Sequence, residues 1–130
     1  MGTLSGYLFL ILAETVLIRK SGELRYEWVP FWSWMYVFEK WPLTHSRIAI
    51  LKQILLNIAM FIPIGFLLGH KGWKSVGISA GISLIIELCQ LISRRGLFEF
   101  DDIVHNTLGA VVGLGLCVSM KRVLDSINLK

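Results

Sequence analysis

The chain has 130 residues, of which 55% are hydrophobic and 17% charged, with a formal net charge of +4. A soluble domain of this size could not bury so much apolar surface, and the mean hydropathy of +0.65 indicates a bilayer as its solvent. The length suits one domain, residues 1–130, and the basic residues flank apolar runs as in membrane proteins, which argues against nucleic-acid binding.

The first apolar run, residues 4–18, predicts a helix that remains in the membrane. It lacks the basic start and the small-residue cleavage site of a signal peptide. At about 15 residues it is short for a full span, which needs about 20. Glu14 lies within it, where a carboxylate can reach the interface by snorkelling.

Residues 19–47 form a long mixed connection that holds four of the five tryptophans. Tryptophan rings prefer the headgroup level of a bilayer, so we expect this segment to lie along the membrane surface. It would act there as an anchor, or as a lid over a site.

Three further helices are predicted over residues 48–69, 75–92 and 102–120, followed by a short polar tail. Pro63 falls inside the first of these, where it removes one backbone hydrogen bond. The sequence therefore predicts an all-α integral membrane protein: an antiparallel bundle of four transmembrane helices, with a long aromatic-rich loop between the first two.

Glycine pairs spaced four apart recur in the last three helices: Gly65/Gly69, Gly77/Gly81 and Gly109/Gly113. Such pairs let helix backbones approach closely in lipid, so we expect close contacts at all three. Polar residues form stripes as well. Ser79, Ser83, Glu87 and Gln90 fall within about 80° of one another on one helix, and Asp102, Asn106, Gly109 and Gly113 within about 60° on the next.

The polar residues are also expected to share one depth. In an alternating four-span chain, Asn57 near the start of the second helix lies level with Glu87 near the end of the third. Asp102 begins the fourth helix on that same side. Since each such group is costly in lipid, their convergence under the long loop indicates a polar cleft or a structural network.

Several spaced residues carry a family resemblance: Glu87-x-x-Gln90, Asp101-Asp102-x-x-x-Asn106-Thr-x-Gly-Ala, Asn57-x-x-x-Phe61-Ile-Pro63-Ile-Gly65 and Pro30-Phe31. Together they resemble the VanZ-like family of small bacterial membrane proteins. Glu27 departs from that pattern, since the family usually has Asn there. The resemblance implies a multi-pass protein of the bacterial plasma membrane, linked to glycopeptide (teicoplanin-type) antibiotic resistance, with no settled biochemical activity.

Two functional hypotheses follow. In the first, the cleft binds a phospholipid headgroup or a lipid-linked cell-wall precursor, with Glu87 and Asp102 as acid–base candidates. The predicted ligand-binding residues are Asn57, Gln90, Asp101, Asn106, Arg94 and Arg95, the arginines attracting an anionic phosphate. In the second, the polar network only fixes helix packing, and partner proteins supply the function. A transporter is a third possibility, weakened by the lack of a repeat.

No enzyme class is assignable, because phosphate-loop, nucleophile-elbow and zinc motifs are absent from the sequence. We expect no cofactor and no metal, and free thiols at Cys89 and Cys117.

The charge distribution gives conflicting evidence on orientation. Eight basic residues fall on the loop side and five on the other, which would place the loop in the cytoplasm. The family's link to drugs that act outside the cell favours the opposite orientation. We expect both termini in the cytoplasm.

Overall fold

The computed structural model describes residues 2–18, 20, 22–39 and 44–128. Its long helices are α1 (Gly2–Leu12), α3 (His45–Leu67), α4 (Lys74–Ser93) and α5 (Phe100–Asn128), and α1 continues into a π-helical turn, η1 (Ala13–Leu17). The helices lie close to the predicted ranges, with one correction. The expected polar tail after residue 120 is helical as far as Asn128, since no proline or glycine interrupts it.

Among the described residues, three helices are long and apolar enough to cross a membrane: α3, α4 and α5. Gly2–Leu17 is apolar but shorter. The prediction of a helical protein with membrane-spanning character is therefore confirmed. The four-span antiparallel bundle stays a prediction.

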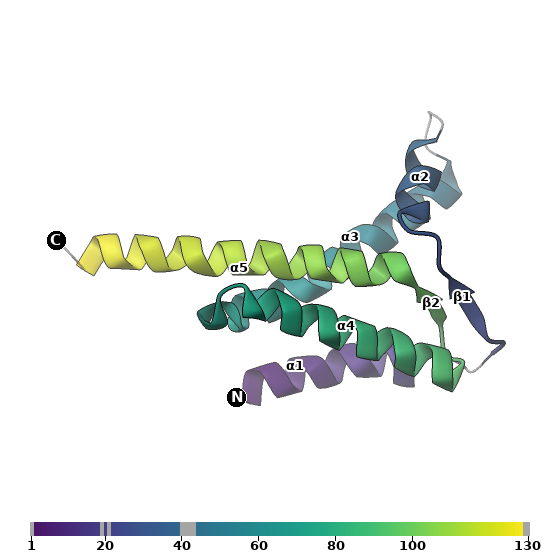
Figure 1. The fold of residues 1–130 in the computed structure, drawn as a ribbon, viewed down its shortest axis with the longest axis horizontal. Coiled ribbons are helices and arrows are strands. Elements are labelled where there is room, and N and C mark those ends of the chain that lie inside the picture. The colour runs from purple at the N-terminus through teal and green to yellow at the C-terminus, as the bar shows by residue number, and fades with distance from the viewer. Residues whose placement is uncertain (1, 19, 21, 40–43, 129–130) are drawn as a thin grey trace.

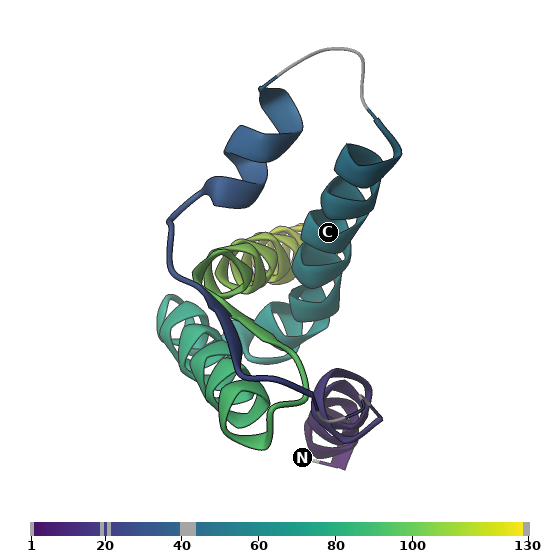
Figure 2. The same cartoon turned by 90° about the vertical axis from the view of Figure 1, so that its right-hand side faces the viewer.

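The segment between the first two long helices contains two elements that the sequence analysis did not predict. These are strand β1 (Arg25–Glu27) and helix α2 (Trp32–Phe38). Strand β1 pairs in parallel with β2 (Leu97–Glu99), so that Glu27 lies opposite Glu99. Figure 2 shows the two strands side by side, although about 70 residues separate them in the chain. The expectation of an all-α fold is wrong to this extent.

Helices α3 and α5 pack with their backbones in close contact. A Cβ added at Gly109 would overlap the carbonyl oxygen of Ile58, and one added at Gly113 would overlap that of Ile62. Gly65 on α3 lies equally close to the backbone of Ala110. These glycines have the close-approach role that the sequence predicted for them.

Helix α4 turns its polar stripe inward instead of its glycines. Ser79, Ser83 and Glu87 are buried, whereas Cβ atoms added at Gly77 and Gly81 would meet nothing within 4 Å. The Ser79 hydroxyl is satisfied within the helix, where its Oγ donates to the Ser75 carbonyl at 2.8 Å. The predicted polar stripe is confirmed, and the prediction of close packing at Gly77 is wrong.

An apolar cluster joins the first helix to the rest of the molecule. Ile11 and Val16 pack with Phe61, Ile64 and Ile86, and the Tyr7 hydroxyl donates to the Met60 carbonyl at 2.8 Å. This cluster lies beneath the end of the molecule where the polar groups gather.

Candidate functional site

The site is built where α4 ends and α5 begins, at the end of the molecule away from both termini (Figure 1). Arg94 adopts a left-handed conformation, with φ of 54°, which ends α4 and turns the chain into β2. The Arg94 carbonyl accepts the Gly22 amide at 2.8 Å, so this turn also holds the segment before β1. Strand β2 then leads directly into α5.

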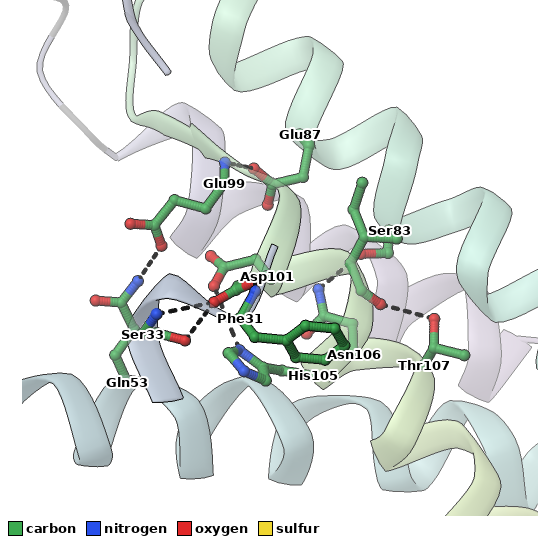
Figure 3. A network of polar contacts seen from close by, with 12 residues as sticks. Phe31, Ser33, Gln53, Ser83, Glu87, Glu99, Asp101, His105, Asn106 and Thr107 are labelled. Carbon is green, nitrogen blue, oxygen red and sulfur yellow. Dashed lines mark hydrogen bonds and ion pairs between the residues drawn. The ribbon is translucent and has the colours of Figure 1, made fainter. Parts of the chain in front are cut away.

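Asp101, a predicted ligand-binding residue, is buried and holds α2 in place (Figure 3). Its Oδ1 accepts the Phe31 amide at 2.5 Å. Its Oδ2 accepts the Ser33 amide at 3.0 Å and the Ser33 hydroxyl at 2.5 Å. Both oxygens are thus occupied by the first turn of α2, which makes Asp101 a cap for that helix.

Glu87, a predicted acid–base residue, lies behind β2 rather than beside the cavity described below. Its side chain is buried, and its Oε2 accepts the backbone amide of Glu99 at 3.0 Å (Figure 3). This contact fixes the strand that carries Glu99. Glu87 therefore positions a neighbouring carboxyl group, and direct participation in chemistry stays a prediction.

A cavity of about 790 Å³ lies between the first helix, α3, β2 and the start of α5. Its polar lining comes from five elements (α1, η1, α3, β2 and α5) and contains three carboxyl groups: Tyr7, Glu14, Thr15, Lys52, Gln53, Asn57, Glu99 and Asp102. Apolar side chains of α3, among them Leu56 and Met60, complete the wall. The cavity thus offers polar and apolar surfaces to one ligand.

Glu99 is a carboxyl group of the cavity whose pKa lies well above its ordinary value. It is buried, and its Oε2 accepts the Gln53 amide at 2.6 Å. The pKa of Glu99 is raised to about 8. Burial is the largest cause, and the charge and hydrogen bonding of the neighbouring Asp102 raise it further. Near neutral pH, Glu99 is therefore mostly protonated and can donate a hydrogen bond.

This pKa predicts a pH dependence of stability. The pKa of Glu99 is higher in the folded protein than in the unfolded chain, so the folded state holds the proton more tightly. The contribution of Glu99 to the free energy of unfolding is therefore greatest in acid, below about pH 4.5, where the group is protonated in both states. That stabilisation is lost as the pH rises from about 4.5 to about 8. We expect the melting temperature in detergent to fall over this range, and Glu99→Gln to reduce the fall by about 5 °C. Glu23→Gln, at an exposed position, should keep the full decline; an unchanged decline in Glu99→Gln would refute the assignment.

The remaining predicted site residues, the acid–base candidate Asp102 and the other ligand-binding residues, are divided between the cavity and its surroundings. Asp102 and Asn57 line the cavity, and Asn57 Nδ2 is buried with no hydrogen-bond partner among the described residues. Gln90 and Asn106 are buried away from it, with Asn106 Nδ2 donating to Ser83 Oγ at 2.8 Å.

Arg94 and Arg95 line a separate cavity of about 310 Å³. Arg95 Nη1 donates to the Leu17 carbonyl at 3.1 Å. The sequence predicted that the two arginines share one cleft with the carboxyl groups. The structure instead places them in a cavity separate from the one that Glu99 and Asp102 line.

The sequence analysis missed Glu99 and Gln53. A signal for Glu99 existed, because a carboxylate between Phe98 and Phe100 is unusual in an exposed turn. Gln53 was treated only as part of the helix entrance.

His105 is a further buried group close to the site. Its Nδ1 lies 3.7 Å from Asp102 Oδ1, and its ring lies edge-on to Trp34 with 5.7 Å between the centroids. Within the described residues, no three His, Cys, Asp or Glu side chains are grouped as a metal ion would require.

The long apolar helices and the polar cavity at one end define a small helical membrane protein. The family model described as VanZ/LLP1 matches residues 3–122, so the chain belongs to this family, as the sequence resemblance predicted. No curated protein and no solved structure matches the chain.

Proposed function

We propose that this protein acts at the bacterial cell envelope by binding the headgroup of a lipid or a lipid-linked cell-wall precursor, and thereby modulates susceptibility to glycopeptide antibiotics. The observation that carries the proposal is the cavity, in which carboxyl and amide groups lie beside an apolar wall. An amphiphile matches such a lining, because its headgroup meets the polar groups while its chains meet apolar side chains.

The proposed arrangement in the membrane follows from the helices. The first helix with η1 would act as a short fourth span beside α3, α4 and α5, in an antiparallel bundle. The exposed side chains of Trp28, Phe31 and Phe38 would then lie at the interface, above the cavity. With both termini in the cytoplasm, the cavity faces the outer leaflet, where cell-wall precursors are used.

Within this proposal, Asp102 is the principal ligand-contacting residue, with Glu99 as its neighbour. A protonated carboxyl beside a second carboxyl suits both headgroup binding and acid–base chemistry. Glu87 keeps a positioning role through the backbone of Glu99.

Asp102→Asn tests the proposal, because it removes charge while keeping shape. We expect this variant to fold at normal abundance and to lose the glycopeptide tolerance that the protein confers, down to the level of cells lacking it. Asp125→Asn, at an exposed position on the same helix, should retain full tolerance. Tolerance is measured together with membrane abundance and melting temperature.

Full tolerance in folded Asp102→Asn would contradict the proposal. It would instead favour the structural hypothesis, in which neutral isosteres are harmless because no charge-dependent ligand is bound.

A further inference from the structure

We propose that the cavity selects amphiphiles whose headgroup carries a primary ammonium group near a phosphate, with the ammonium at Glu14, Glu99 and Asp102 and the phosphate at Lys52. This inference rests on the proposed function and names the class of headgroup. It follows from the elements that supply the charged lining, since the three carboxyl groups come from η1, β2 and α5 and the Lys52 ammonium comes from α3.

The acidic part of the lining comes from three different elements. Glu14 comes from η1, Glu99 from β2 and Asp102 from α5, so the carboxyl groups converge from different parts of the chain. A primary ammonium offers three N–H donors, one for an oxygen of each residue, since the carbonyl oxygen of a protonated Glu99 also accepts a hydrogen bond.

The donor part of the lining lies on α3. Lys52 supplies the single ammonium group among the described lining residues, and it is exposed at the rim. Asn57 adds a buried amide nitrogen that has no partner among the described residues and therefore can donate to a headgroup oxygen. An unpaired buried donor is costly, and an oxygen of a bound headgroup would satisfy it.

An anionic headgroup without an ammonium fits this cavity less well. The arginines that would favour it lie in the separate 310 Å³ cavity, while the carboxyl groups of the main cavity would repel a phosphate placed among them. A quaternary ammonium fits less well also, because its methyl groups replace all the N–H donors.

The test uses the full chain purified in a neutral detergent. It is incubated with an equimolar mixture of dioleoyl phosphatidylethanolamine, phosphatidylcholine and phosphatidylglycerol, and bound lipids are counted by native mass spectrometry. We expect the wild type to retain the phosphoethanolamine lipid about tenfold over the other two. Glu14→Gln and Asp102→Asn should lose this preference, and Asp125→Asn should keep it. Because Glu14 is exposed, its variant gives a result even where Asp102→Asn fails to fold.

A second experiment distinguishes the two kinds of ligand that carry a primary ammonium near a phosphate, a phospholipid and a lipid-linked cell-wall precursor. It compares a polyprenyl-diphosphate muropeptide bearing a free side-chain amine with its N-acetylated form. Preference for the free amine, without retention of phosphatidylethanolamine, identifies the precursor as the source and still supports ammonium selection.

Three outcomes overturn the inference. If phosphatidylglycerol or the N-acetylated precursor binds as tightly as its amine-bearing counterpart, the ammonium selection is wrong while headgroup binding stands. The same holds if both carboxyl variants keep the preference. If the wild type retains none of these ligands and Asp102→Asn keeps full tolerance, the proposed function fails together with the inference.

Discussion

Gly109→Leu in α5 is expected to unfold the protein in detergent, whereas Gly77→Leu in α4 leaves it folded. A side chain at residue 109 would be driven into the carbonyl of Ile58, which belongs to the backbone of α3 and cannot move aside alone. Overpacking of this kind costs about 3 kcal/mol or more, a large part of the stability of a small domain. The melting temperature and the yield of monodisperse protein measure the effect.

Gly77 is the matched control, because it is also a helical glycine of a Gly-x-x-x-Gly pair. Open space surrounds it, so its leucine variant should melt within about 2 °C of the wild type. If both variants lost the same amount of thermal stability, the α3–α5 contact would be no more tightly packed than the outer face of α4, and the prediction would be wrong.

The contrast between these glycines shows what the sequence could predict. Apart from the end of α5, which continues eight residues beyond residue 120 to Asn128, apolar runs gave the helices to within a few residues, because length and hydrophobicity are local properties. The placement of Ser79, Ser83 and Glu87 on one face of α4 followed from helical geometry. Helix α4 has a serine face and a glycine face on opposite sides. Which of the two faces packs against a neighbouring helix depends on the position of α5, and the residue spacing within α4 does not reveal that position.

The site shows a similar division. The sequence placed the polar groups at one end and included Asp102 and Asn57, both of which line the cavity. It did not reveal that Glu87 binds the backbone of Glu99, because strands of three residues give too short a pattern to recognise. Parallel pairing of β1 with β2 is also non-local, so neither strand predicts the other.

Asp101→Ala is expected to release α2 from the rest of the molecule. The substitution leaves three donors without their acceptor: the amides of Phe31 and Ser33 and the Ser33 hydroxyl. Phe31 also adopts φ of 60°, a conformation that residues other than glycine rarely adopt, and Asp101 holds its amide there. At about 1 kcal/mol or more for each lost hydrogen bond, the variant should lose roughly 3–5 kcal/mol of stability.

Hydrogen exchange over residues 31–38 measures the release directly, alongside the melting temperature. The amides of α2 should exchange much faster in Asp101→Ala, while those in the middle of α5 remain protected. Asp125→Ala, at an exposed position on the same helix, should change neither measurement. Normal protection of α2 in Asp101→Ala would mean that the buried Ser33 and Val37 side chains hold this helix in place without the carboxylate.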